Sequence, residues 1–230
     1  MPVFFLFGFW YCSIYPHKKQ SSDLKLYLIL YILNGYTLVE RYRKMKETVR
    51  HSILSGVLIG IGTALSVQTE NIYVRAMLFS VALLVIIDRE LKLYTGKIGY
   101  IKDIPLKTLG VILVFNFIGV ASVIFALFTK SGFYEQCLAV AIPKFQSGYL
   151  ELFVRGFMCG ICMFIAVHCK KPLITVFCIM TFILAGFEHC IVDFPYLCIN
   201  FSWDNLLKFM LIVLGNSLGS ITINALIKKD

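Results

Sequence analysis

Uncharged apolar runs, separated by short polar and basic stretches, dominate this chain. A helix needs about 20 mostly apolar residues to cross a bilayer, and six runs qualify once the shorter ones are extended into their flanks. They lie at 51–69, 76–87, 108–129, 156–169, 172–187 and 209–227. The pattern predicts an all-α integral membrane protein with six transmembrane helices.

The second and fifth runs differ from the others because polar residues follow them at membrane depth. These are Asp88, Arg89, Glu90, Lys92, Thr95 and Gly96 in the second, and Glu188, His189 and Asp193 in the fifth. Backbone that leaves a helix inside lipid is tolerated only where it is buried in protein or lines a cavity. Interrupted segments at corresponding positions of two halves indicate a transport pathway. We therefore expect two broken helices around a central pathway.

The two halves of the chain correspond to each other. The third and sixth runs share the pattern N-x-x-G, at 116–119 and 216–219, and the first and fourth contain Gly56 and Gly156, each followed by small residues. Small residues let membrane helices approach closely. Each half has three spans, an odd number, so the second half must insert upside down. The sequence predicts a 3+3 inverted repeat.

Composition agrees with this class and excludes others. Hydrophobic residues make up 59% and charged residues 15% of the chain, too few charges for a soluble domain of this size. The net charge of +9 does not indicate nucleic-acid binding, because the basic residues sit at the ends of apolar runs.

The distribution of basic residues predicts the orientation in the membrane. Lys and Arg favour the cytoplasmic side, and they are in excess on the side of the N-terminus. That side has Arg41, Arg43, Lys44, Lys46, Arg50, Lys97, Lys102, Lys107, Lys170, Lys171, Lys228 and Lys229, against Arg75, Lys130, Lys144, Arg155 and Lys208 on the other. Both termini are expected to be cytoplasmic, in a multi-pass protein of the plasma or inner membrane.

The first 44 residues differ from the rest of the chain in the length of their apolar runs. Their apolar runs, 2–15 and 26–39, are too short to span, and neither follows a basic segment as in a signal peptide. We expect an interfacial or cytoplasmic segment over 1–44 and a six-helix channel domain over 45–230. A native start at Met45 is the alternative.

Cysteine usage does not indicate a redox or metal centre. Cys159 and Cys162 form a C-x-x-C pattern, but both lie inside an apolar run, where free Cys behaves as a small hydrophobic residue. We expect no metal and no cofactor.

Several short motifs resemble those of the formate/nitrite transporter family. The letters G-F-E-H-C at 186–190 resemble the G-F-E-H-S of its broken fifth helix, and L-Y-T-G at 93–96 resembles the L-F-T-G of its second-helix loop. S-G-V-L-I-G at 55–60 resembles the start of its first helix, and Arg155-Gly156 resembles the start of its fourth. F-N-F-I-G at 115–119 and G-N-S-L-G at 215–219 resemble its repeated G-N-x-x-G. The motifs follow one another in family order.

The resemblance implies an aquaporin-like fold, a homopentamer, and one pore per protomer for formate, nitrite, hydrosulfide or similar anions. His189 and Thr95 would form the central substrate and proton site. The implied pore constrictions are Phe79, Leu83, Leu93, Tyr94 and Phe182. Lys144 would lie in a vestibule, where the alternative is a solvated loop lysine. Glu188, Asn116 and Asn216 would support the broken helices.

The loop of the second span departs from the family pattern. Lys92 stands where the family has an acidic residue, Tyr94 replaces a Phe, and Lys97 replaces an Asn. Asp88-Arg89-Glu90 is an extra charged stretch, and we expect Lys92 and Arg89 to pair with Asp88 and Glu90, since buried charges are usually paired. Gly160 replaces an Asn of the fourth helix. Gating or selectivity should differ accordingly.

These features predict a passive or proton-coupled transporter of weak-acid anions rather than an enzyme. A buried imidazole is expected to be neutral and to offer one N–H to an anion, so His189 could donate a hydrogen bond or a proton to it. A structural His189 bonded to Glu188 or to a carbonyl is the alternative. Rival functions are a neutral-solute pore, although N-P-A elements are lacking, a membrane enzyme, and a transport-inactive or differently gated homologue.

Overall fold

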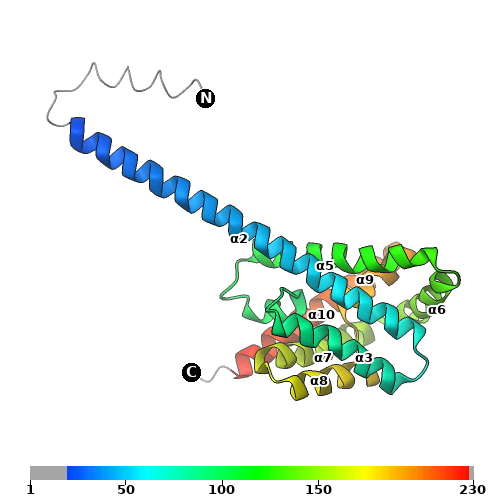
Figure 1. Ribbon diagram of the computed structural model, residues 1–230. Coiled ribbons are helices and arrows are strands. Elements are labelled where there is room, and N and C mark those ends of the chain that lie inside the picture. Colours follow the sequence, from blue (N-terminus) through cyan, green and yellow to red (C-terminus); the bar gives the residue numbers. More distant parts are fainter. Residues whose placement is uncertain (1–19, 228–230) are drawn as a thin grey trace. The chain divides into compact units, whose positions relative to one another are not determined.

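The computed structural model describes residues 20–227, without the side chains of 20–31, 33, 34 and 36. Every regular element in this part of the chain is helical (Figure 1). The elements are α2 (Gln20–Gln68), α3 (Ile72–Asp88), α4 (Tyr94–Lys97), η1 (Ile98–Tyr100), α5 (Leu106–Ala126), η2 (Leu127–Thr129), α6 (Phe133–Gln146), α7 (Tyr149–Cys169), α8 (Pro172–Leu184), α9 (Cys190–Ile199) and α10 (Trp203–Ile227).

The chain divides into two compact units, Met1–Glu47 and Thr48–Asp230. In the first unit, the predicted run 2–15 lies outside the described residues, whereas 26–39 belongs to the long helix α2. Lys44 and Glu40, one turn apart on α2, form an ion pair of 2.9 Å. The second unit contains the six predicted spans.

Four helical segments are long and apolar enough to cross a membrane: Thr37–Gln68, Leu106–Thr129, Tyr149–Cys169 and Trp203–Ile227. The other two spans are broken, as predicted. The second consists of α3 and the short α4, and the fifth consists of α8 and α9. The chain turns between their halves through residues of positive φ, Glu90 at 50° and Gly186 at 66°. The all-α fold with six spans, two of them broken, is confirmed.

The second unit is held together by close helix contacts. Helix α7 packs along α10 and against α8, and α8 packs against α3 (Figure 1). The final part of α2 meets α5 through Gly56, where an added Cβ would lie 2.2 Å from the carbonyl oxygen of Asn116. A methyl group cannot be accommodated there, so glycine sets the approach of these two backbones.

The same contact recurs in the second half, with a register that differs from the one suggested by the sequence. A Cβ on Gly160 would lie 2.2 Å from the carbonyl oxygen of Asn216. The structural counterpart of Gly56 is therefore Gly160 and not Gly156, which lies one helical turn earlier on α7. The pairing of Gly56 with Gly156, predicted from the sequence, is therefore wrong by four residues. Gly56 and Gly156 are each followed by small residues at helical spacing, and this pattern does not show at which glycine the two helices cross.

Candidate functional site

Two buried asparagines hold the broken spans in place. Asn116 on α5 accepts a hydrogen bond of 2.8 Å from the backbone N–H of Tyr94, and its amide group donates to the carbonyls of Ser52 and Lys92. Asn216 on α10 accepts one of 2.8 Å from the N–H of Cys190 and donates to the carbonyls of Gly156 and Glu188. Each side chain therefore satisfies backbone groups that the break in a span leaves without helical partners.

The matching hydrogen bonds define equivalent positions in the two halves. Tyr94 corresponds to Cys190, because each gives its N–H to one asparagine. Leu93 then corresponds to His189, and Lys92 corresponds to Glu188. The two halves thus place a leucine and a histidine at equivalent points, and a cation and an anion just before them.

His189 forms the centre of the site together with Thr95. His189 Nε2 lies 3.0 Å from Thr95 Oγ1, and both residues are buried. His189 precedes α9, and its Nδ1 accepts a hydrogen bond of 3.4 Å from the N–H of Val192. In a neutral imidazole the other nitrogen carries the proton, so Nε2–H donates to the threonine hydroxyl. The site therefore presents an N–H donor between the two halves of the fold.

Aromatic and aliphatic side chains surround this donor. The ring of Phe182 on α8 lies 6.1 Å from the His189 ring and 5.8 Å, edge to face, from the ring of Phe79 on α3. The remaining predicted constriction residues, Leu83, Leu93 and Tyr94, are buried in the same hydrophobic cluster. The five side chains come from α3, the α4 region and α8, and all of them are buried in this cluster.

A polar stripe on α10 supports the loop that carries Thr95, and it was not among the predicted site residues. Ser220 Oγ lies 2.9 Å from the carbonyl oxygens of Thr95 and Gly160. Asn224 donates to the carbonyl of Gly99, and Ser217 Oγ lies 2.9 Å from the Tyr94 hydroxyl. The spacing of 217, 220 and 224 places these residues on one helix face, a signal that was available in the sequence.

At one end of the site, Lys144 lies between two carboxylates. Lys144 on α6 pairs with Glu188 and lies 3.0 Å from Asp193 Oδ1, and its side chain is only 15% exposed. Arg155 Nη1 lies 3.8 Å from Glu188 Oε1. Burial alone would lower the pKa of Lys144, but the carboxylates of Asp193 and Glu188 more than offset burial and raise that pKa. Lys144 is thus a largely buried, charged lysine and not a solvated one.

Asp193 is the least satisfied member of this cluster. Its side chain is 1% exposed, and neither carboxylate oxygen receives a hydrogen bond of good geometry from the described residues. Its contact with Lys144 is therefore mainly one of charge. Glu151 also belongs to this cluster, since it pairs with Arg155. The cluster therefore contains two cations, Lys144 and Arg155, and three carboxylates, those of Glu151, Glu188 and Asp193.

At the other end, the charged loop of the second span is paired differently from the prediction. Arg89 and Asp88 do pair, at 3.3 Å and largely exposed. Lys92, however, donates to Thr48 Oγ1 at 2.6 Å, and Glu90 pairs at 2.9 Å with Lys170, which follows α7. The hydrogen bond and charge of Lys170 lower the pKa of Glu90. The expected pairing of Lys92 with an acidic neighbour in this loop is wrong, because α7 brings Lys170 to Glu90.

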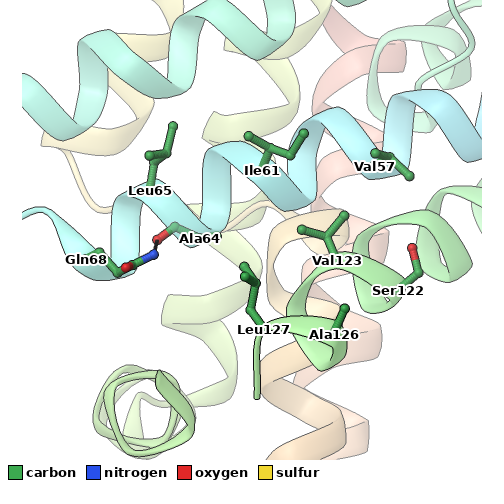
Figure 2. Close-up of a pocket in the computed structure, with 9 residues that line it drawn as sticks. All are labelled: Val57, Ile61, Ala64, Leu65, Gln68, Ser122, Val123, Ala126 and Leu127. Carbon is green, nitrogen blue, oxygen red and sulfur yellow. Dashed lines mark hydrogen bonds between the residues drawn. The ribbon is translucent and has the colours of Figure 1, made fainter. Parts of the chain in front are cut away.

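A separate apolar groove of about 570 Å³ lies between α2 and α5. Figure 2 shows side chains of both helices along it, with Leu65 and Ile61 on α2 and Val123 and Leu127 on α5. None of its lining residues belongs to the predicted site. Its lining is almost entirely aliphatic, as expected for a surface in contact with lipid.

Comparison with known proteins places this arrangement in context. A family model described as "Formate/nitrite transporter" matches residues 37–228. Among solved structures, the fold is similar to an "FNT family ion channel" with a TM-score of 0.68 at 19% identity, covering 82% of this chain and 90% of the other. It is also similar to a "Pentameric formate channel with formate bound", with a TM-score of 0.59 at 17% identity, covering 80% and 92%. No curated protein sequence matches the chain.

Proposed function

Because this chain belongs to the formate/nitrite transporter family, we propose that it carries small monovalent anions of weak acids, such as formate, nitrite or hydrosulfide, across a membrane. The pathway runs between the two broken spans, past His189 and Thr95. The observation that carries the proposal is the buried hydrogen bond of 3.0 Å between His189 Nε2 and Thr95 Oγ1, which joins the two halves inside an apolar cluster.

The chemistry of this pair suits a weak-acid anion. An N–H donor within a dry, apolar surrounding offers an anion the hydrogen bond that water would otherwise provide, and such bonds are stronger when one partner is charged. An arriving anion can take the place of the threonine oxygen as the acceptor. It can then leave as the anion, or take up a proton that reaches the site from solvent and continue as the neutral acid, while the imidazole stays neutral and keeps its Nε2 proton.

The apolar neighbours explain why protonation of the anion would assist its transport. A hydrophobic constriction such as the one formed by Phe79 and Phe182 dewets and opposes a bare ion. The neutral acid loses far less hydration free energy on entering the same constriction. Protonation of the anion next to Phe182 would therefore lower the free-energy barrier to passage at the constriction itself. Anion flux would increase when the external pH falls.

Assembly and placement follow the same proposal. One structural neighbour is described as pentameric and as having formate bound, and we propose a homopentamer in which each protomer contains its own pathway. We place the protein in the plasma or inner membrane with both termini in the cytoplasm, in agreement with the excess of Lys and Arg on that side. Residues 1–44 would form an interfacial or cytoplasmic segment ahead of the channel domain 45–230.

A flux assay on the purified protein in liposomes tests the proposal. Vesicles containing the protein should take up formate, nitrite or hydrosulfide faster than empty vesicles, and faster at acidic than at neutral external pH. Glycerol serves as the neutral comparison and should not be carried. Carriage of glycerol without any of the anions would contradict the proposal and favour a neutral-solute pore.

A further inference from the structure

The side chain of Tyr94 bridges the two halves of the fold and is fixed at both of its ends. Its backbone begins α4, where its N–H donates a hydrogen bond of 2.8 Å to Asn116 on α5. Its hydroxyl lies 2.9 Å from Ser217 Oγ on α10, 123 positions further along the chain. The side chain is buried. The phenol ring is therefore held between a helix of the first half and a helix of the second.

A second contact of Ser217 shows which hydroxyl is the donor. Ser217 Oγ donates to the carbonyl of Val213, one turn earlier on α10, at 2.7 Å. A serine hydroxyl has one hydrogen to donate and two lone pairs that can accept. The O–H of Tyr94 is therefore the donor and Ser217 Oγ is the acceptor. If the ring turned away from Ser217, a buried donor would lose its partner, which is unfavourable.

Both ends of this bridge lie next to residues of the central site. Tyr94 directly precedes Thr95, whose hydroxyl meets His189 Nε2 at 3.0 Å. Ser217 directly follows Asn216, which binds a backbone group on each side of His189. The ring of Tyr94 thus runs from the segment that carries the central threonine to the helix that braces the central histidine.

The equivalent position in the first half carries an aromatic ring instead of a hydroxyl. Asn116 and Asn216 are equivalent, so Ser217 corresponds to Phe117. The ring of Phe117 stacks on Phe194 of α9, with centroids 4.3 Å apart and planes 7° apart. The second broken span is thus packed through aromatic faces at this point, whereas the first is fastened through two hydroxyl groups. Each hydroxyl can be removed without changing the aromatic ring.

We propose that the hydrogen bond between Tyr94 and Ser217 limits the size of the weak-acid anions that this chain carries. Fastened at its hydroxyl, the ring keeps one position in the hydrophobic cluster that it shares with Phe79 and Phe182. Tyr94 is then a specificity-determining residue, and Ser217 is a positioning residue that acts through it. The inference rests on the proposed anion transport, and it narrows the substrate class to anions about as small as formate.

Loss of the hydrogen bond should widen the range of anions rather than abolish transport. An aromatic ring without this bond can adopt a second rotamer, and the constriction is then no longer of one width. The net contribution of one such hydrogen bond corresponds to a change of about twofold to tenfold in the population of the fastened position. Passage of an anion larger than formate should increase by a similar factor.

The test compares two anions in the same liposomes. Initial rates of uptake of formate and of lactate, a larger anion from an acid of similar strength, are corrected for empty liposomes and expressed as a lactate-to-formate ratio. In Tyr94→Phe and in Ser217→Ala this ratio should rise about twofold to tenfold, and the double variant should rise no further than either single one. The ratio does not depend on the amount of folded protein, so a loss of stability alone leaves it unchanged.

Matched variants separate the hydrogen bond from other effects. Ser217→Thr keeps the hydroxyl and should retain the low ratio. Ser122→Ala removes a serine hydroxyl that bonds to the carbonyl of Gly119 on its own helix, in the separate groove between α2 and α5, and should not change the ratio.

Three results would overturn the inference: an unchanged ratio in either Tyr94→Phe or Ser217→Ala, a further rise in the double variant, or an equal rise in Ser122→Ala. A rise in Tyr94→Phe alone would show that the tyrosine hydroxyl acts without Ser217. An unmodified protein that carries neither anion would instead overturn the proposed function, and the inference with it.

Discussion

His189 and Thr95 are 94 positions apart in the chain, belong to opposite halves of the fold, and meet at 3.0 Å through Nε2 and Oγ1. Both side chains are almost completely buried. The contact depends on both asparagine braces, because Asn116 holds the loop before Thr95 and Asn216 holds the loop that contains His189. The hydrogen bond thus joins the two halves at the point where each span is broken.

The threonine hydroxyl is expected to be needed for this contact. In Thr95→Val the side chain keeps its shape but leaves His189 Nε2–H without an acceptor, at a cost of about 1–3 kcal/mol. We expect slower anion flux and a lower melting temperature in detergent, whereas Thr95→Ser, which keeps the hydroxyl, should retain most of both. Unchanged flux in Thr95→Val would show that the hydroxyl has no part in transport.

The helix contacts at Gly56 and Gly160 should not tolerate a methyl group. An added Cβ at either position would lie 2.2 Å from a backbone carbonyl oxygen, so Gly56→Ala or Gly160→Ala must push two helices apart. Overpacking of this kind costs about 1–3 kcal/mol, and we expect a lower melting temperature and less folded protein.

Gly110→Ala is the matched control for these two substitutions. Gly110 lies inside α5, and an added Cβ would meet nothing within 4 Å. Alanine has the higher helix propensity, by about 1 kcal/mol, so this variant should be as stable as the unmodified protein or slightly more so. A Gly160→Ala protein as stable as Gly110→Ala would contradict the register assigned to α7 and α10.

Lys144 is expected to be needed for folding because of the carboxylates around it. Lys144→Met would leave Glu188 and Asp193 buried without a cation, and removing one partner of a buried ion pair costs about 3–5 kcal/mol. We expect this variant to be poorly folded in size-exclusion chromatography. The combination Lys144→Met, Glu188→Gln and Asp193→Asn removes all three charges and should recover much of the folded protein. If Lys144→Met alone folds normally, the cluster contributes little to stability.

The sequence predicted the order of spans and the two breaks because both are local properties. Uncharged runs mark the spans, and polar residues such as Thr95 and His189 next to apolar runs mark the breaks. The ion-pair partners of the charged residues were harder to predict from the sequence. Lys144 and Asp193 are far apart in the chain, and only the packing of α6 beside α9 brings them together. The pairing of Glu90 with Lys170 has the same origin.

Two further features, the register of the glycine contacts and the polar stripe on α10, differ in how well residue spacing along a helix predicts them. The register of Gly56 against Gly160 depends on where the helices cross, which repeated small residues do not specify. The polar stripe of Ser217, Ser220 and Asn224, in contrast, was visible as polar residues on one face of an apolar helix. Polar side chains are costly in a membrane helix, so their spacing already indicated a partner, here the backbone of the α4 region.

The substitution His189→Phe tests the central donor most directly. Phenylalanine fills a similar volume and removes a buried polar group, and its neighbours Phe79 and Phe182 already form an aromatic cluster. We therefore expect the variant to fold and insert, with Thr95 losing one hydrogen bond. Anion flux should fall to the level of empty vesicles, because the constriction remains and no N–H is available to the anion.

The control is a smaller side chain at the same position. If His189 served only to fill space, His189→Ala would destabilise the protein by leaving a cavity, and His189→Phe would transport at the unmodified rate. If His189 is the donor, His189→Ala and His189→Phe both lose anion flux, whatever their stabilities. Formate uptake at acidic external pH, measured on variants with verified assembly and membrane insertion, distinguishes the two. Unmodified uptake by His189→Phe would rule out the histidine mechanism, because this variant has no Nε2–H to offer to the anion.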